Sequence, residues 1–157
     1  SKYRISEGLR AEIVAQFGCR CAYCQTQQQI SGVRLTVDHI VPESLGGTTD
    51  KRNLCLACWD CNLYKAARVS VFDNQSQQNV RLFHPQAQAW FDHFEWSSEG
   101  SLMIGRTTIG QVSIAALRMN RPELVISRKF WVEGDGILLI NLLMSWLELE
   151  NPTLAVN

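Results

Sequence analysis

The sequence has no excess of charge of either sign and no apolar run long enough to cross a membrane. Its 157 residues include 15 Lys and Arg against 15 Asp and Glu, so the net charge is zero and no global basic field indicates a partner. The longest apolar run, residues 137–147, is interrupted by Asn141 and Ser145. A membrane-spanning helix needs about 20 apolar residues. We therefore expect no membrane association.

No secretory signal and no internal repeat is recognisable, so we expect a cytoplasmic protein in a reducing compartment. The six cysteines are then better explained by metal binding than by disulfides. Hydrophobic residues make up 46% of the chain, which favours a packed core over disorder. The charges are unevenly distributed: residues 1–68 carry a net +3 and residues 69–157 a net −3.

Two C-x-x-C pairs lie within the basic half of the chain and bracket a short segment, Cys21 with Cys24 and Cys58 with Cys61. Zn²⁺ accepts four thiolates in a tetrahedron, and two pairs around a short segment are a strong signal for such a site. Cys19 and Cys55 do not fit the two-residue spacing, and we interpret them as small buried apolar residues. The sequence thus predicts one structural zinc that joins the two ends of a roughly 40-residue segment.

Between and after the pairs lie three further motifs: Asp38-His39-Ile40-Val41-Pro42, Asn53-Leu54, and Asn62 with Lys65 directly after the last cysteine. Together with the cysteine frame, they resemble the zinc-stapled HNH endonucleases. The usual third letter of that family is His, and here the position is Asn62. The resemblance implies an α+β fold with a ββα-metal (His-Me finger) nuclease core.

Local patterns predict how the core is assembled. We expect a helix at 6–17 capped by Ser6, a loop at 25–31, a strand over 33–38, and a loop through Pro42 and 46–47. A helical turn at 49–52 and a helix within 58–68 would complete the core. We expect residues 1–70 to form this nuclease core and residues 71–157 to form an α/β extension packed on it.

The extension resembles one found on many bacterial HNH proteins, where its motifs serve packing. We expect strands at 80–85 and 102–105 and helices at 108–119 and 124–132. The aromatic-rich stretch 88–96 is better explained as core than as a surface that stacks on bases. We interpret His84 and His93 as structural.

The chemistry expected of these motifs is phosphodiester hydrolysis. His39 suits the general base, because imidazole exchanges protons near neutral pH. Asp38 and the side-chain oxygen of Asn62 would hold a divalent ion, Mg²⁺ or Mn²⁺. The resemblance assigns Asn53 to bracing the loop and orienting His39. Lys65 either contacts phosphate or is a solvated helix residue.

Simpler interpretations stay open for two of these residues. Asn62 could be a helix N-cap, and Asn53 could serve only its own turn. The leading hypothesis is a DNA endonuclease that leaves a 5′-phosphate and a 3′-hydroxyl, with RNA as a possible substrate. The alternative is a non-catalytic, zinc-stabilised module that binds nucleic acid or protein. Target sequence, strand preference and oligomeric state are not determined by the sequence.

Overall fold

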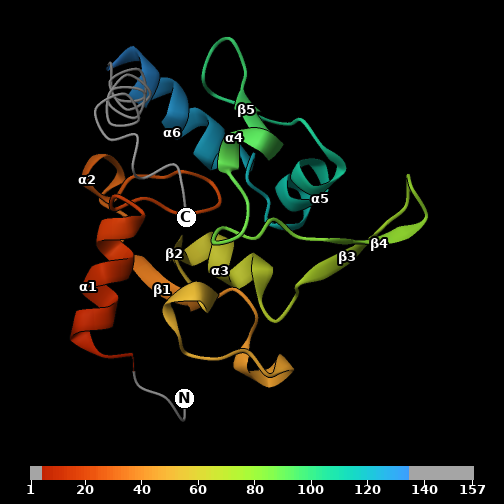
Figure 1. Ribbon diagram of the computed structural model, residues 1–157. Helices are drawn as coiled ribbons and strands as arrows, with labels where there is room; N and C mark the ends of the chain where they lie inside the picture. The colour runs from red at the N-terminus through yellow and green to blue at the C-terminus, as the bar shows by residue number, and fades with distance from the viewer. Residues whose placement is uncertain (1–4, 135–157) are drawn as a thin grey trace.

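The computed structural model describes residues 5–134 (Figure 1). The expected apolar run 137–147 lies outside these residues. The fold is α+β, as predicted. Its helices are α1 (Glu7–Gln16), α2 (Gln28–Ser31), η1 (Glu43–Leu45), η2 (Lys51–Asn53), α3 (Trp59–Lys65), α4 (Trp90–His93), α5 (Thr108–Ala116) and α6 (Pro122–Glu133). Its strands are β1 (Leu35–His39), β2 (Leu54–Cys58), β3 (Ser70–Asp73), β4 (Gln78–Arg81), β5 (Phe94–Trp96) and β6 (Met103–Gly105). Within residues 5–134, no helix is long and apolar enough to cross a membrane.

Strands β1 and β2 with helix α3 form the predicted ββα unit (Figure 1). The strands are antiparallel, with Leu35 opposite Cys58 and His39 opposite Leu54. Four residue steps separate the two pairs, which is about 14 Å along a strand. The hairpin therefore carries a cysteine ligand at one end and the candidate catalytic histidine at the other.

Helix α1 forms where predicted, and it delivers the chain to the first cysteine pair. Ser6 caps it by accepting a hydrogen bond from Leu9 N at 3.2 Å, and Ile13 is completely buried. The predicted loop at 25–31 instead contains the short helix α2. Gly32 ends α2 with a left-handed φ of 67°, so the following strand begins at Leu35 and not at Val33.

The segment after residue 70 consists of two hairpins and two main helices, with the β3–β4 hairpin projecting from the body (Figure 1). The predicted strand at 80–85 ends at Arg81, because Phe83 N donates to Ser113 Oγ and leaves the ladder. The predicted helix at 108–119 ends at Ala116, and Arg118 adopts φ 48°. The predicted helix at 124–132 starts earlier, because Pro122 occupies its first turn.

One hydrophobic core joins the two parts of the chain. Buried residues from α1, β2, β5, β6 and the loops after α5 belong to a single cluster. The aromatic stretch contributes Phe94, which is fully buried between the rings of Phe83 and Trp90. His93 lies within this ring cluster, as predicted, whereas Phe91 is 47% exposed and is not core.

Helix α6 is attached directly to the two cysteine pairs. Arg128 is 1% exposed, donates to the carbonyl of Cys24 at 3.3 Å and lies over the Trp96 ring. Arg121, just before α6, forms an ion pair of 2.8 Å with Asp60, which lies between Cys58 and Cys61. The described part of the extension therefore packs on the core, and the division at residue 70 stays a prediction.

Candidate metal and catalytic site

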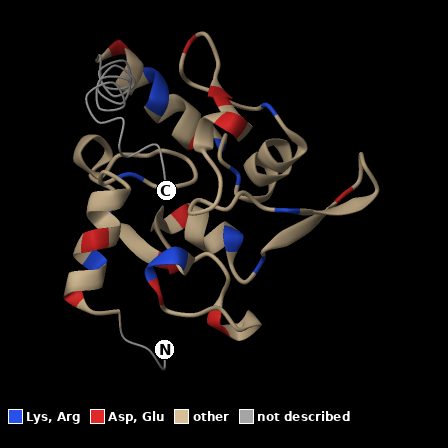
Figure 2. Cartoon of the chain, in the orientation of Figure 1, with Lys and Arg blue, Asp and Glu red and all other residues tan. Residues whose placement is uncertain are grey.

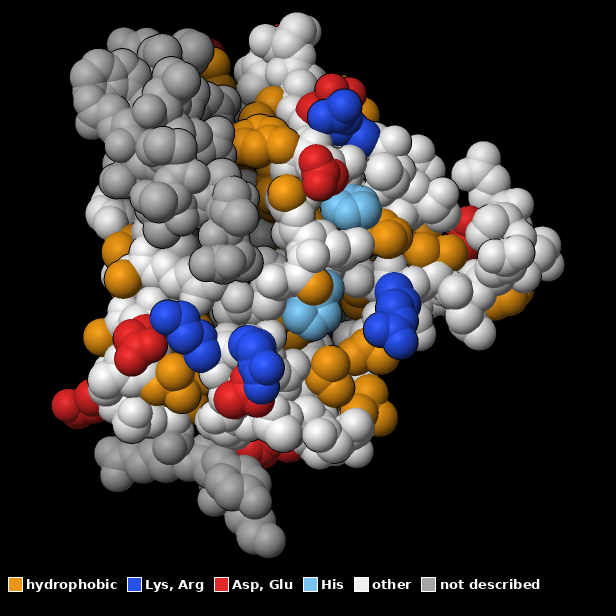
Figure 3. Space-filling view, in the orientation of Figure 1, with side chains coloured by type: hydrophobic (Ala, Val, Ile, Leu, Met, Phe, Trp, Pro, Cys, Tyr) orange, Lys and Arg blue, Asp and Glu red, His pale blue; other side chains and the backbone are white. Residues whose placement is uncertain are grey.

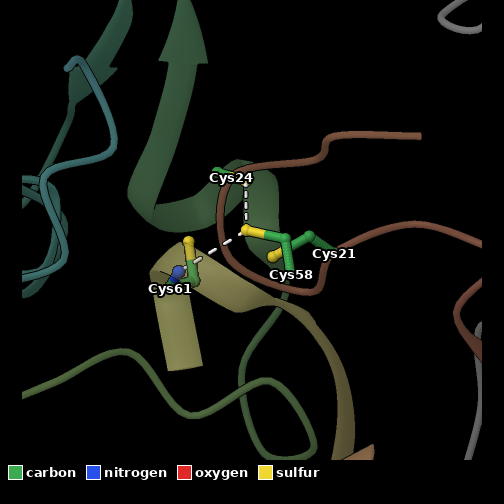
Figure 4. Close-up of side chains that lie close together, drawn as sticks. All are labelled: Cys21, Cys24, Cys58 and Cys61. Atoms are coloured by element: carbon green, nitrogen blue, oxygen red, sulfur yellow. Dashed lines mark hydrogen bonds between the residues drawn. The ribbon is translucent and has the colours of Figure 1, made fainter. Parts of the chain in front are cut away.

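Four cysteine sulfurs meet where the loop after α1 lies against the junction of β2 and α3 (Figure 4). All four residues, Cys21, Cys24, Cys58 and Cys61, are buried, and their sulfur atoms lie within 4.8 Å of one another. The Sγ atoms of Cys24 and Cys58 are 3.7 Å apart. A tetrahedron with Zn–S bonds of about 2.3 Å has edges of about 3.8 Å. The donor set therefore fits a closed, structural zinc site.

Burial and mutual contacts shift the pKa values of the four thiols in opposite directions: those of Cys21 and Cys61 are raised, and those of Cys24 and Cys58 are lowered. Burial raises the pKa of the Cys21 thiol well above its usual range, because a buried thiolate loses its hydration. Zn²⁺ bound by the four sulfurs would offset that cost. The Sγ of Cys58 also accepts the backbone N–H of Cys61 at 3.5 Å and so caps α3.

The other two cysteines lie outside this cluster, as predicted. Cys55 is buried, contacts Tyr23 Oη at 3.6 Å through its sulfur, and has a pKa that burial raises to about 12. Cys19 is half-exposed with φ 55°, so its interpretation as a buried apolar residue is wrong.

His39 lies at the end of β1, where the chain enters the loop to β2. Its Nε2 is 2.8 Å from Thr49 Oγ1 and 3.8 Å from Glu43 Oε1, and its side chain is 17% exposed. Asp38 does not orient the ring, since neighbouring strand residues point to opposite sides. The sequence did not predict Thr49 and Glu43 as the partners of the ring, although Glu43 follows His39 by four residues.

Asp38 is paired with Lys65 from helix α3. The Lys65 Nζ is 2.9 Å from Asp38 Oδ2 and donates to the carbonyl of His39 at 2.8 Å. The Lys65 side chain is 3% exposed, and the Asp38 side chain is 13% exposed. The interpretation of Lys65 as a solvated helix residue is therefore wrong. Burial raises the pKa of Asp38, and the charge of Lys65 opposes that rise. A phosphate contact by Lys65 stays a prediction.

Asn53 binds both sides of the loop that follows His39. Its amide nitrogen donates to the carbonyls of Val41 and Thr48, both at 2.9 Å, and its side-chain oxygen accepts the N–H of Val41 at 2.9 Å. Gly47 makes this possible, because a Cβ there would lie 1.8 Å from the carbonyl oxygen of Val41. Asn53 therefore holds the backbone of the loop, while Thr49 and Glu43 contact the His39 ring.

Asn62 is the fourth residue of α3, and Cys58 is the N-cap. The interpretation of Asn62 as a helix cap is therefore wrong. Residues three apart on a helix are neighbours on its surface. Asn62 thus lies one turn before Lys65, whose Nζ contacts Asp38 Oδ2 and the carbonyl of His39.

Residues 21–68 match the family model described as HNH endonuclease. The matched residues include both cysteine pairs, Asp38, His39, Asn53 and Asn62. This segment is an HNH endonuclease domain. HNH domains are generally nucleases, and the family implies a nucleic-acid substrate. No curated protein matches the chain. The HNH domain described here thus combines the cysteine cluster at one end of its hairpin with Asp38 and His39 at the other.

Proposed function

We propose that this protein is a metal-dependent DNA endonuclease whose general base is His39 and whose catalytic ion is held by Asp38 and Asn62. The observation that carries the proposal is the position of these three residues. Asp38 and His39 end strand β1, and Asn62 lies one turn before Lys65, which contacts both of them, inside the segment matched to the HNH family. Hydrolysis would leave a 5′-phosphate and a 3′-hydroxyl.

The contacts of His39 support its role as a base. When Nε2–H donates to Thr49 Oγ1, the ring lone pair is on Nδ1, which can then accept a proton from water. Glu43, 3.8 Å from Nε2, stabilises the imidazolium that results. Asn53 supports this geometry by holding the loop backbone, so we assign it a positioning role.

The donor chemistry fits a hard divalent ion. The ion pair with Lys65 uses one oxygen of Asp38, Oδ2, so Oδ1 and the Asn62 side-chain oxygen are suited to Mg²⁺ or Mn²⁺. When bound, such an ion offsets the negative charge that develops on the phosphate and the leaving oxygen. The buried ammonium of Lys65 holds the Asp38 carboxylate in place. The zinc has a separate, structural role, since four thiolates leave no open position on it.

The test is a nicking assay on supercoiled, linear and single-stranded DNA and on RNA, with Mg²⁺, Mn²⁺ or EDTA. We expect cleavage of DNA that EDTA abolishes and Mg²⁺ restores while zinc content and fold persist. Asp38→Ala and Asn62→Ala should lower the rate about 100-fold or more, whereas Asn79→Ala on exposed β4 should not.

Two results would contradict the proposal. One is cleavage by Asn62→Ala that equals the parent at limiting Mg²⁺, which would place the ion elsewhere. The other is binding of nucleic acid without cleavage under any condition, which would favour the non-catalytic module.

A further inference from the structure

A cavity of ≈ 250 Å³ lies between the HNH domain and the segment that follows it. The domain contributes Tyr23, Ile40 and Val41, and the later segment contributes Leu82, Phe83 and Ile109. Neither part of the chain encloses the cavity alone. Pockets for drug-sized ligands hold about 300–1,000 Å³, so this one admits a group the size of a single heterocycle.

The charge around the cavity is positive. Arg68, three residues after α3, and Arg81, at the end of β4, both line it, and no Asp or Glu does so among residues 5–134. Figure 2 shows basic residues where β3 and β4 leave the body. The Arg68 side chain donates to the carbonyl of Ala116 at 2.9 Å, whereas the side chain of the exposed Arg81 makes no hydrogen bond or ion pair with the described residues. A cavity with apolar walls and a cationic rim suits a heterocycle that carries a phosphate.

His84 adds a polar group without a partner. Its Nδ1 is buried and makes no hydrogen bond within the described part of the chain. Its backbone N–H donates to Gln88 Oε1 at 2.8 Å, which fixes the turn that holds it. Burial lowers the pKa of His84, which favours the neutral form of its ring. A neutral imidazole can hydrogen-bond the polar edge of a base. Figure 3 shows histidine and basic side chains together on this face.

The cavity lies close to the candidate catalytic histidine. Ile40 and Val41 follow His39 directly in the chain, and Lys65, which also lines the cavity, donates to the carbonyl of His39. Two residues span at most about 7 Å. Successive nucleotides of one strand are about 3.4 Å apart in B-DNA. A nucleotide in the cavity would thus lie within a few steps of a phosphate at His39.

From this arrangement we infer that the cavity receives one unstacked nucleotide of the nucleic-acid substrate, with its base against the apolar wall and its phosphate on Arg81. The inference rests on the proposed function and extends it to substrate choice. An extruded base costs least where the strand is already unpaired. The protein should therefore prefer single-stranded, mismatched or flapped sites over a regular duplex.

Binding can be measured without cleavage in the His39→Ala protein in EDTA, at several salt concentrations. The probe is a single-stranded 12-nucleotide DNA that carries the fluorescent base 2-aminopurine, compared with its duplex and with free adenosine monophosphate. Ala87 is exposed and lines the cavity, so Ala87→Leu fills it without disturbing the core. Ala89→Leu is its matched control, since Ala89 is exposed and lies outside the cavity.

We expect Ala87→Leu to weaken single-strand binding about tenfold and to leave the salt dependence unchanged, because it removes a base contact. Arg81→Gln should weaken binding and reduce the slope of log K against log salt by about 0.7, because it removes one phosphate contact. Ala89→Leu, and Arg106→Gln as the arginine control, should change binding less than twofold. The 2-aminopurine fluorescence should change when the oligonucleotide binds the protein that has Ala87. It should not change when the oligonucleotide binds the Ala87→Leu variant.

The outcomes separate this inference from the proposed function. If Ala87→Leu changes neither cleavage nor binding, the nucleotide site in the cavity is wrong, and the proposed nuclease activity still stands. Binding that depends on Ala87, without cleavage by the protein with His39, would retain the site and overturn the nuclease. Adenosine monophosphate bound as tightly as the oligonucleotide would make the cavity a site for free nucleotides and would also overturn the inference.

Discussion

The two ends of the β1–β2 hairpin differ in how they are held. At the cysteine end, all four cysteines are buried, and their sulfurs form a closed metal site. At the other end, the loop after His39 is largely half-exposed, and side-chain hydrogen bonds from Asn53 and Thr49 hold it. One end is stabilised by burial and metal ligation, the other by a few polar contacts. Changes should therefore affect mostly stability at the first end and mostly activity at the second.

The largest effect on stability is expected for the zinc ligands. Structural zinc contributes on the order of 10 kcal/mol to small modules, which is comparable to the whole stability of a domain. Cys58→Ser should therefore yield unfolded, zinc-free protein by circular dichroism and metal analysis. Cys19→Ser, outside the cluster, is the control and should keep its zinc. A Cys58→Ser protein that folds without zinc would show that metal ligation does not stabilise the cysteine end of the hairpin.

The buried ion pair beneath the site should come second. Lys65→Met leaves the Asp38 carboxylate buried without its partner, and such losses cost about 3–5 kcal/mol. Denaturant unfolding should show this loss, and adding Asp38→Asn should recover part of it. Lys51→Met breaks the exposed pair with Glu12, 3.2 Å long, and should cost less than about 1 kcal/mol. Equal costs at Lys65 and Lys51 would show that Lys65 is not a buried partner of Asp38.

Asn53 should affect stability and activity together, since it joins the scaffold to the loop. Asn53→Ala removes three hydrogen bonds and leaves partners of the loop backbone unsatisfied, which costs about 1–3 kcal/mol. The nicking rate should fall at temperatures where the protein is still folded. An Asn53→Ala variant with a lower melting temperature but the parent's cleavage rate would show that Asn53 does not position His39.

Substitution of His39 should have the smallest effect on stability and a large effect on activity. His39→Ala removes a partly exposed ring whose contacts are one hydroxyl and one carboxylate, so unfolding free energy should change by less than about 1 kcal/mol. The nicking rate should fall about 10²- to 10⁴-fold, the usual contribution of a general base. Thr49→Val should lower the rate less, because the ring is still present. Equal rates for His39→Ala and the parent would end its assignment as the base.

The sequence by itself predicted the cysteine cluster and helix α1, because each depends on local spacing or periodicity, and the resemblance to the HNH family implied the ββα unit. Two C-x-x-C pairs predict four ligands wherever the chain brings them together. A capped amphipathic stretch predicts α1, and the family motifs mark Asp38, His39, Asn53 and Asn62 before any fold is known.

Only the tertiary structure decided which groups surround those residues. It buried Lys65 against Asp38, 27 residues away in the chain, and placed Thr49 against His39. It also attached α6 to the carbonyl of Cys24 through Arg128 and formed a cavity from both parts of the chain. These contacts join residues that no short-range period relates, and each depends on where the backbone folds back. Burial, which turns an ordinary lysine into the partner of a buried carboxylate, exists only after the core has packed.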